Sequence, residues 1–457
     1  MKASIIIPVW NGADVIADCL AALRQNAGAS LQEVICVENA STDESANIIQ
    51  SQHDWVNLIR QPVNLGFAGG INVGVQASQG EVIVLLNQDC LVLPGWLDEL
   101  VDALDTHPKV GVMGSTIYHA DGTINHTGAV IQKPEATGVH LTDLPTEKVR
   151  PVDFVTGAAM AIRRTTWNRI GPFDDAYYPA YFEDADYCYR ARRKGIGVAC
   201  ATFARVSHLF SGRDWQLDYY RHAVYTNTSR YRFVCKHFQP NEFSHFFQAE
   251  KAAIEATQYL NEVTGRLAAA RHTLRFFNRI MESRQHDLED KLSVAACRHL
   301  QVGFNQIIQL TFQVIKQLLK IVDMSDSSYA NPNAEASADS FMEQLQKSTR
   351  SLEGLRMREL NLVSSLYFRS ALDTRPESAL KHLGRIVFKR LPSLLIGRDE
   401  RIMKELYQIR STQINEIEQQ INEIEQLINK TGRRADLRAD LLVDLLELLN
   451  QYDDYYQ

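Results

Sequence analysis

Hydrophobic runs and helical patterns alternate over the first part of the chain. Residues 3–9 form a continuous run rich in β-branched side chains, which is typical of a buried parallel strand. Residues 14–25 then carry apolar side chains at a helical spacing, at positions 15, 16, 19, 20 and 23. Further strands are predicted at 33–38, 55–60, 81–86 and 110–117, with helices between them. This alternation predicts an α/β domain with a doubly wound, mostly parallel sheet.

Polar clusters follow three of the predicted strands. Trp10 and Asn11 follow the first strand, Glu38 and Asn39 the second, and Asn87-Gln88-Asp89 the fourth. Ligands of such sheets bind outside the carboxyl ends of the strands, so this placement predicts one shared site. A carboxylate in the third cluster suits a hard cation that bridges a diphosphate, and a turn or helix cap is the alternative.

The glycines exclude two common nucleotide motifs. Neither GxGxxG nor GxxxxGK[ST] follows the first strand. The glycine-rich turn instead follows the third strand, where Gly66, Gly69 and Gly70 would let a ligand approach the backbone closely. The alternative is a tight strand-to-helix turn without a ligand.

Composition narrows the classes of partner and compartment. The chain has 457 residues, is 45% hydrophobic and carries a net charge of -7, which argues against nucleic-acid binding. Its seven scattered cysteines have no CxxC spacing and are expected to be free thiols in a reducing compartment. No apolar stretch reaches the roughly 20 residues needed to span a bilayer. We therefore expect a cytoplasmic protein, at most peripheral at the inner face of the membrane.

Acids are concentrated in residues 178–193. Glu183, Asp184 and Asp186 lie within four positions, among aromatic residues and arginines. They predict either catalytic carboxylates or the acidic start of an amphipathic helix. Asp186 and Arg190 stand at i and i+4 and are expected to pair with each other.

Four histidines are weighed as metal ligands. His208 follows a predicted strand and becomes a ligand only if the fold brings it beside Asp89. His119, His126 and His140 have irregular spacing and are expected at the surface of hairpins or of a lid.

Six segments follow one another along the chain at residues 5–11, 37–43, 64–68, 86–89, 155–160 and 182–186. Together and in this order, they resemble family 2 glycosyltransferases with the GT-A fold. The resemblance covers about residues 1–235 and is strongest to the bacterial rhamnosyl- and galactofuranosyltransferase-like branch.

The resemblance implies a nucleotide-sugar site and a divalent metal, Mg²⁺ or Mn²⁺. The implied donor-binding residues are Pro8, Val9, Asn11, Glu38, Asn39, Asn64, Gly66, Asn87 and Gly157. Asp89 ends the segment that corresponds to the family's Asp-x-Asp metal motif, in which Asn87 takes the first position. His208 matches a histidine that completes metal binding in related enzymes. Glu38 stands where the family usually has Asp.

The resemblance also implies an inverting glycosyltransferase. The donor would be dTDP-rhamnose or a UDP-sugar, and the acceptor a hydroxyl of a bacterial surface glycan or of a lipid-linked glycan. Asp184 is the predicted general base, and Glu183 is expected to raise its pKa by like-charge repulsion. The alternative is a catalytically degenerate transferase domain that acts as an oligomeric scaffold in a glycan-assembly complex, which the departures at Glu38 and Asn87 favour.

The second half of the chain has a helical character with few Gly or Pro. We predict a transferase domain at 1–238, a helical region at 239–324, a polar linker or disordered loop at 325–340 and a second helical region at 341–457.

Two segments of the last region suggest partners. Residues 380–398 are basic and amphipathic, which fits either an anionic membrane surface or a solvated face. Isoleucines at 414, 417, 421, 424 and 428 form a short coiled-coil seam. It pairs either within a hairpin at about 400–449 or between chains of a homo-oligomer.

Overall fold

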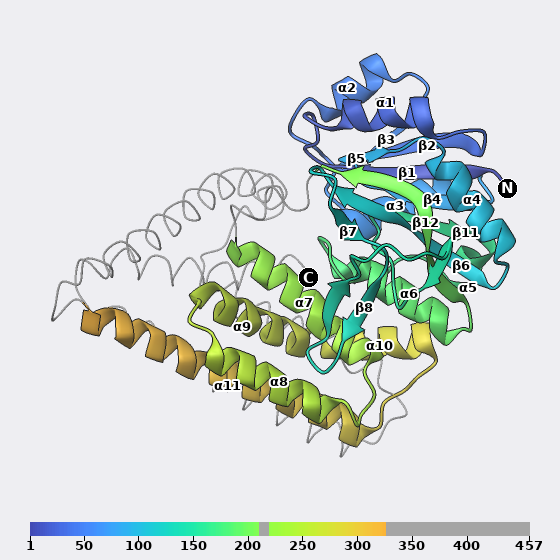
Figure 1. Ribbon diagram of the computed structural model, residues 1–457. Coiled ribbons are helices and arrows are strands. Elements are labelled where there is room, and N and C mark those ends of the chain that lie inside the picture. Colours follow the sequence, from blue (N-terminus) through green and yellow to red (C-terminus); the bar gives the residue numbers. More distant parts are fainter. Residues whose placement is uncertain (210–218, 326–457) are drawn as a thin grey trace, which may run out of the picture. The chain divides into compact units, whose positions relative to one another are not determined.

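The computed structural model describes residues 1–209 and 219–325 (Figure 1). The chain forms two compact units, Met1–Ile315 and Lys316–Gln457. The predicted linker beyond Ser325, the basic segment at 380–398 and the coiled coil at 400–449 lie outside the described residues. The domain boundary predicted at 238 stays a prediction.

A ten-stranded sheet forms the centre of the first unit, in the order β10-β12-β6-β11-β4-β1-β2-β3, with β5 paired to β12 and β7 to β6. Its strands are β1 (Ala3–Val9), β2 (Leu31–Glu38), β3 (Asn57–Arg60), β4 (Val82–Leu86), β5 (Cys90–Val92), β6 (Val110–His119), β7 (Ile124–His126), β10 (Val149–Pro151), β11 (Ala159–Arg163) and β12 (Gly197–His208). The predicted α/β class is confirmed, and each strand expected from the hydrophobic runs is present within a few residues.

The sheet is parallel on one side of β4 and mixed on the other. β4, β1, β2 and β3 pair in parallel, and so do β6 and β12. β11, which the sequence did not predict, lies antiparallel between β4 and β6. For β11 to lie parallel to β6, the chain between them would need a crossover connection, usually a helix, but only short strands lie between β6 and β11.

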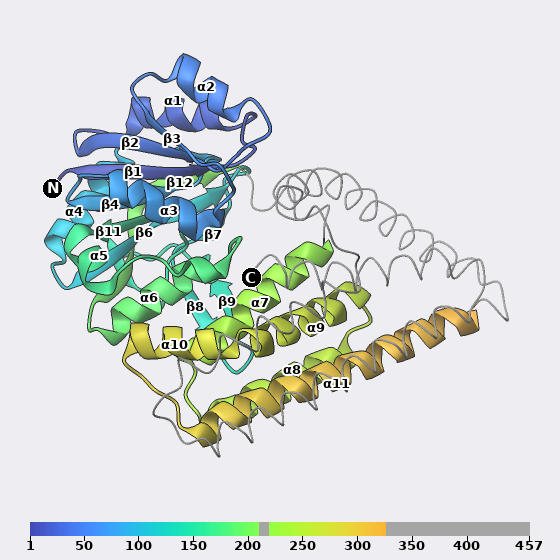
Figure 2. The same ribbon diagram turned by 180° about the vertical axis from the view of Figure 1, so that it is seen from behind.

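Helices cover both faces of the parallel strands (Figures 1 and 2). The side chains of Ile5 and Ile7 in β1 pack in one core cluster with α1 (Ile16–Asn26) and α4 (Trp96–Thr106). Ile6 points to the opposite face, where α3 (Gly66–Ala77) lies so close that a Cβ at Gly74 would meet Ile6 Cγ2 at 2.3 Å. Burial on both faces explains why β1 reads as a continuous apolar run. The helix α2 (Ser45–Gln52) packs against α1.

The chain between β6 and α6 carries the smaller elements of the first unit. β8 (Ala129–Gln132) and β9 (Thr137–His140) form the expected hairpin. They are followed, after β10 and β11, by α5 (Arg164–Ile170), the short 3-10 helix η1 (Asp175–Tyr177) and α6 (Glu183–Arg193).

Every regular element described from Tyr219 onward is a helix, as predicted. The helices are α7 (Tyr219–His237), α8 (Phe243–Ala256), α9 (Leu260–Arg275), α10 (Phe277–Leu288) and α11 (Val294–Ser325). α7 packs along α9 and also contacts α6 and α10. In α11, Phe304 packs edge-on against Phe247 of α8.

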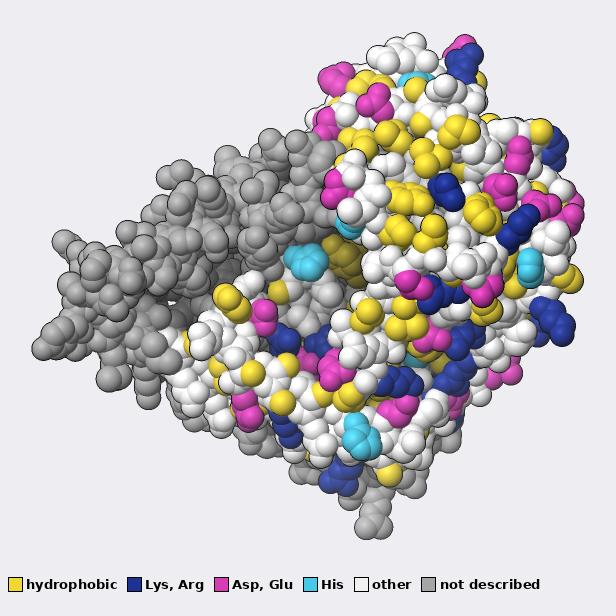
Figure 3. All heavy atoms as spheres, viewed as in Figure 1, with side chains coloured by type: hydrophobic (Ala, Val, Ile, Leu, Met, Phe, Trp, Pro, Cys, Tyr) yellow, Lys and Arg dark blue, Asp and Glu magenta, His cyan; other side chains and the backbone are white. Residues whose placement is uncertain are grey.

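The surface and the cysteines agree with the composition. On the described part of the face in Figure 3, acidic and basic side chains are interspersed, without a dominant basic area. All seven cysteines are free, and all but Cys297 are buried. Within residues 1–209 and 219–325, the helices are too short or too polar to cross a membrane.

Candidate active site

The turns after β1 and β2 interlock at the carboxyl edge of the sheet. Asn39 N donates to the Val9 carbonyl at 2.8 Å. Asn11 N donates to Ser41 Oγ at 3.1 Å, and Asn11 Oδ1 accepts a hydrogen bond from Thr42 N at 2.9 Å. These bonds fix both loops against each other before any ligand is present.

The side chains of Glu38 and Val9 stabilise the fold at this edge. The buried carboxylate of Glu38 accepts from Ser41 N, which closes the turn after β2. The Val9 side chain is fully buried in the core, so only its backbone is available to a nucleotide.

Asn39 carries an unmatched polar atom at the same edge. Its Nδ2 donates to the Gly66 carbonyl at 3.1 Å, whereas its buried Oδ1 has no hydrogen-bond partner. A buried acceptor without a donor costs about 1–3 kcal/mol. A ligand hydroxyl or N–H group can remove that cost. Pro8 lies beside this amide, since a Cβ at Gly70 would meet Asn39 Nδ2 at 2.9 Å and Pro8 Cβ at 3.3 Å.

Gln88 joins the first turn to the cluster after β4. Trp10 N donates to Gln88 Oε1 at 3.0 Å, and Gln88 Nε2 donates to the Trp10 carbonyl at 3.0 Å. These two hydrogen bonds hold the Gln88 side chain against Gly12, where a Cβ would meet Gln88 Oε1 at 2.3 Å. Trp10 is 45% exposed, so its indole is available to a ligand.

The glycine-rich turn before α3 connects the donor edge to the acidic segment. Asn64 Oδ1 accepts from Gly66 N at 2.8 Å, and Gly66 adopts a φ of +69°. A Cβ at Gly66 would meet the Pro179 carbonyl at 2.8 Å. Phe67 N donates to that same carbonyl at 2.9 Å, so the turn rests directly on the chain that leads to Glu183.

Asp89 and His208 meet at the end of the sheet. β5 pairs antiparallel with β12, and His208 lies opposite Cys90 in the register. As a result, Asp89 Oδ1 is 3.0 Å from His208 Nε2, and both side chains are partly exposed. Asn87 Nδ2 lies 3.5 Å from the same imidazole nitrogen.

This pair has the donor chemistry of a divalent-cation site. A carboxylate suits both Mg²⁺ and Mn²⁺, and the imidazole favours the transition metal Mn²⁺, with the remaining positions open to oxygens of a ligand. Cys90 Sγ lies in the same group of ligand atoms, all within 4.8 Å of one another. Burial raises the pKa of the Cys90 thiol well above its usual range, so the protonated sulfur is a poor ligand. The residues therefore fit a metal held by Asp89 and His208.

Asp184 is held by two backbone amides at the start of α6. Gly157 N donates to its Oδ2 at 3.0 Å, and Ala185 N to its Oδ1 at 2.7 Å. Burial raises the pKa of Asp184, although these two N–H groups and nearby His140 oppose the shift. The result is a carboxylate of increased basicity in a fixed orientation.

Glu183 is the more strongly perturbed neighbour. Burial, and then the charge of Asp184, raise the pKa of Glu183 well above its usual range, and its buried Oε2 has no hydrogen-bond partner. The like-charge effect that we expected at Asp184 thus falls mainly on Glu183. Tyr181 and Phe182 precede the pair with φ values of 83° and 66°, a region that costs non-glycine residues energy and is typical of functional sites.

Asp186 is a structural residue. It is fully buried and pairs with Arg190 at 2.8 Å, which confirms the predicted i, i+4 pair. Burial alone would raise its pKa, but Lys236 and Arg190 hold the pKa of Asp186 well below its usual range.

The predicted site residues form one connected edge. Contacts run from Asn11 to the turn after β2, from Asn39 to Gly66, from the glycine turn to Pro179, and from Gly157 to Asp184. A backbone bond from Asn87 N to the Ala158 carbonyl at 2.9 Å joins the metal cluster to this chain of contacts.

Sequence reasoning missed some members of this edge. Gln88 was given no role of its own, although its position between Asn87 and Asp89 is a signal that its side chain faces the same edge.

The expectation that His126 lies at the surface is wrong. His126 is fully buried against His140, with their ring centroids 4.7 Å apart. Its strand, β7, pairs with β6, which carries the side chain inward.

Residues 4–166 match the family model described as Glycosyl transferase family 2. The N-acetylglucosaminyl-diphospho-decaprenol L-rhamnosyltransferase of Mycobacterium tuberculosis is 25% identical over 203 residues, which cover 38% of this chain and 66% of the relative.

Other relatives are longer. The O-antigen biosynthesis protein RfbC of Myxococcus xanthus is 28% identical over 224 residues, which cover 45% of this chain and 17% of that protein. An uncharacterized protein of Sinorhizobium fredii is 28% identical over 219 residues, 24% of its length. The chain thus spans a quarter or less of these two relatives. The crystal structure of GalNAc-T7 with UDP, GalNAc and Mn²⁺ covers 55% of this chain and 51% of its own, at 16% identity and a TM-score of 0.45.

Proposed function

We propose that this protein is an inverting glycosyltransferase that moves a sugar from a nucleoside diphosphate donor, dTDP-rhamnose or a UDP-sugar, to a hydroxyl of a bacterial glycan or lipid-linked glycan. The observation that carries the proposal is the fixed carboxylate of Asp184, which stands on the same continuous edge as the interlocked donor turns and the Asp89–His208 pair. The family match of residues 4–166 and the names of the relatives support the reaction class.

The residues divide the work of a single displacement. The turns at Asn11, Asn39 and Gly66 bind the nucleotide, with the free Oδ1 of Asn39 as an acceptor for a donor hydroxyl or base N–H. Asp89 and His208 hold the divalent cation, which neutralises charge on the departing diphosphate when bound.

Asp184 supplies the proton acceptor. An acceptor hydroxyl is a weak nucleophile until its proton is removed. As the acceptor oxygen bonds to the anomeric carbon, its proton passes to an oxygen of Asp184 and the bond to the diphosphate breaks. One carboxylate suffices for this inversion. Burial and the charge of Asp184 raise the pKa of neighbouring Glu183, which disfavours a second negative charge beside the base.

A donor panel tests the proposal. The full chain is incubated with UDP-, dTDP- and GDP-sugars and Mg²⁺ or Mn²⁺, and binding and sugar release are measured. We expect saturable binding of one nucleotide class and metal-dependent release or transfer. Failure to bind or turn over any donor would reject the proposal.

The second candidate is a degenerate transferase domain that acts as an oligomeric scaffold, and the departures at Glu38 and Asn87 favour it. In the structure, Glu38 closes its own turn through Ser41 N. The scaffold predicts donor binding without turnover, together with self-association of the full chain, for which the seam at 400–449 is the proposed contact. Turnover in the same donor panel and sedimentation of the full chain are measured together. Turnover supports the transferase, whereas binding without turnover in a self-associating chain supports the scaffold.

A further inference from the structure

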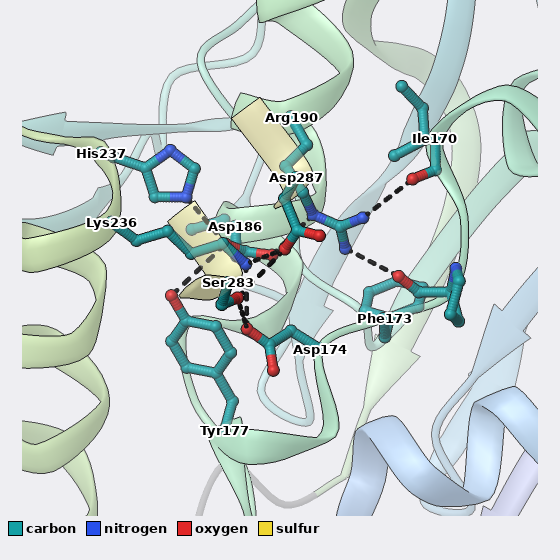
Figure 4. A network of polar contacts seen from close by, with 12 residues as sticks. Ile170, Phe173, Asp174, Tyr177, Asp186, Arg190, Lys236, His237, Ser283 and Asp287 are labelled. Carbon is teal, nitrogen blue, oxygen red and sulfur yellow. Dashed lines mark hydrogen bonds and ion pairs between the residues drawn. The ribbon is translucent and has the colours of Figure 1, made fainter. Parts of the chain in front are cut away.

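Lys236, near the end of α7, lies at the centre of a buried cluster of charged side chains (Figure 4). Its ammonium nitrogen is 2.9 Å from Asp174, 2.8 Å from Asp186 and 2.6 Å from Asp287. The lysine side chain is 0% exposed. An ammonium group has three N–H donors, enough for three carboxylates, and its contact with Asp174 is a hydrogen bond. The acceptors come from three places: Asp174 caps η1, Asp186 belongs to α6, and Asp287 belongs to α10.

Two arginines complete the charge balance of the cluster. Arg190 binds Asp186 at 2.8 Å, and Arg232 binds Asp174 at 2.7 Å. With the ammonium group, they match the three carboxylates. His237 Nε2 lies 2.8 Å from Asp186, and burial lowers the pKa of His237 to about 4, so the imidazole acts as a neutral donor. Buried charges are tolerated when they are paired in this way.

The cluster holds both ends of the segment that carries the proposed base. Asp174 stands at the start of this segment and Asp186 at its end, two residues beyond Asp184. Between them lie Tyr181 and Phe182, with their positive φ values. A backbone conformation of this kind persists only where contacts with the surrounding structure hold it in place. One lysine side chain thus fixes both boundaries of the strained segment.

The middle of the segment is held separately. The Pro179 carbonyl accepts from Phe67 N at 2.9 Å, which fixes the segment to the glycine turn. The cluster around Lys236, by contrast, lies entirely outside the family match at residues 4–166. α7 and α10 therefore supply a fixation that the matched part of the chain lacks.

We propose that Lys236 is a positioning residue for sugar transfer: by binding Asp174 and Asp186 together, it fixes segment 174–186 and sets Asp184 against the acceptor hydroxyl. This inference rests on the proposed function for its kinetic consequence, whereas the fixation itself is a property of the folded chain.

The test uses a charge-balanced variant of the full chain, Lys236→Met with Asp287→Asn, which removes one positive and one negative charge. The control is Arg230→Met with Glu250→Gln. Arg230 is also a buried residue of α7, and its Nη2 lies 2.7 Å from Glu250 Oε1. Glu250 belongs to α8, so this pair does not include a residue of segment 174–186. Lys236→Arg is a second, milder variant, because its planar guanidinium keeps the charge but not the compact geometry that contacts three carboxylates at once.

Hydrogen–deuterium exchange over residues 175–185 gives the readout that needs no substrate. We expect exchange there to be at least about tenfold faster in the balanced variant than in wild type or control. With an active donor, kcat should fall by about tenfold to a hundredfold while the donor KM stays nearly constant. Lys236→Arg should lie between the two.

Unchanged exchange in the balanced variant, or equal effects in the control, would overturn the inference. A wild-type chain that turns over no donor would instead reject the proposed function. In that case the exchange experiment still decides whether Lys236 fixes the segment.

Discussion

Asp89 Oδ1 lies 3.0 Å from His208 Nε2, although 119 residues separate them in the chain. The contact depends on the pairing of β5 with β12, which brings a strand end and a distant histidine to one corner of the sheet. Both side chains are partly exposed there, as a site open to a diphosphate requires. The pair links the strand pairing to the proposed metal chemistry.

Removal of either ligand should weaken metal binding. We expect Asp89→Asn and His208→Ala each to lower Mn²⁺ affinity by at least about tenfold. Loss of a residue that only supports a metal ligand typically lowers metal affinity by about 10–100-fold, and loss of a ligand itself should cost no less. Calorimetric titration of Mn²⁺ in the presence of the bound nucleotide measures this. Asp98→Asn is the control, since Asp98 only holds Ala29 and Ser30 in the loop before β2. Equal Mn²⁺ affinity in all the variants would contradict the metal assignment.

Asp184→Asn should retain donor binding and lose transfer. The amide keeps an oxygen for Gly157 N but cannot accept the acceptor's proton at catalytic rates. General-base catalysis typically contributes about 10²–10⁴-fold, so kcat should fall by that order while the donor Kd stays nearly constant. Donor titration and initial rates on one protein preparation give both quantities. Wild-type rates in this variant would refute Asp184 as the base.

The pH dependence distinguishes the two neighbouring acids. Burial raises the pKa of Asp184, so kcat should fall as the pH decreases through a value above the ordinary range of an aspartate. Burial and the charge of Asp184 raise the pKa of Glu183 as well. If Asp184 is the base, Glu183→Gln should keep an acidic limb in the kcat profile, because the proton acceptor is still present. Loss of that limb would indicate that Glu183 is the group that must ionise.

The sequence predicted what local patterns determine. The run of residues 3–9 marks β1 because burial on both faces leaves Ser4 as its one polar residue. The Asp186–Arg190 pair follows from helix geometry alone. β11 was missed because its apolar run, residues 159–162, is too short to distinguish a strand from a helix, and because its place between β4 and β6 is set by a long excursion of the chain.

The charge cluster was beyond local reasoning. Lys236 contacts a carboxylate 62 residues away, and its charge next to Arg232 would ordinarily predict a solvated face. Only tertiary packing of α7 against α6 and α10 turns these polar residues inward. The same limit applies to His126, whose burial depends on the pairing of β7 with β6.

Gly12→Ala should weaken donor binding through Gln88. The added Cβ would meet Gln88 Oε1 at 2.3 Å and displace the Gln88 side chain from its two hydrogen bonds to the Trp10 backbone. Gln88→Ala removes the same two hydrogen bonds directly. We therefore expect each single variant to lower donor affinity and the double variant to be no weaker than Gln88→Ala alone, a non-additivity typical of residues in contact. Additive losses in a nucleotide titration would show that Gly12 acts by another route.

The buried carboxylates predict a loss of stability in acid. Burial alone would raise the pKa values of Asp174 and Asp186, but Arg232, Lys236 and Arg190 hold both well below the ordinary range. Groups with a depressed folded-state pKa contribute stability that is present above the unfolded value of about 3.9 and is lost as the pH falls through the folded value. Glu183 and Asp184 have raised pKa values and act in the opposite sense, since their contribution decreases as the pH rises.

The free energy of unfolding should therefore fall steeply below about pH 4. Asp186→Asn should lower it by about 3–5 kcal/mol at neutral pH, because the variant leaves Lys236 and Arg190 with one carboxylate fewer, and should flatten its decrease in acid. Urea unfolding between pH 3 and pH 7 measures both effects. Parallel pH profiles for wild type and variant would mean that folding does not change the pKa of Asp186, which would contradict the ion pairs drawn in Figure 4.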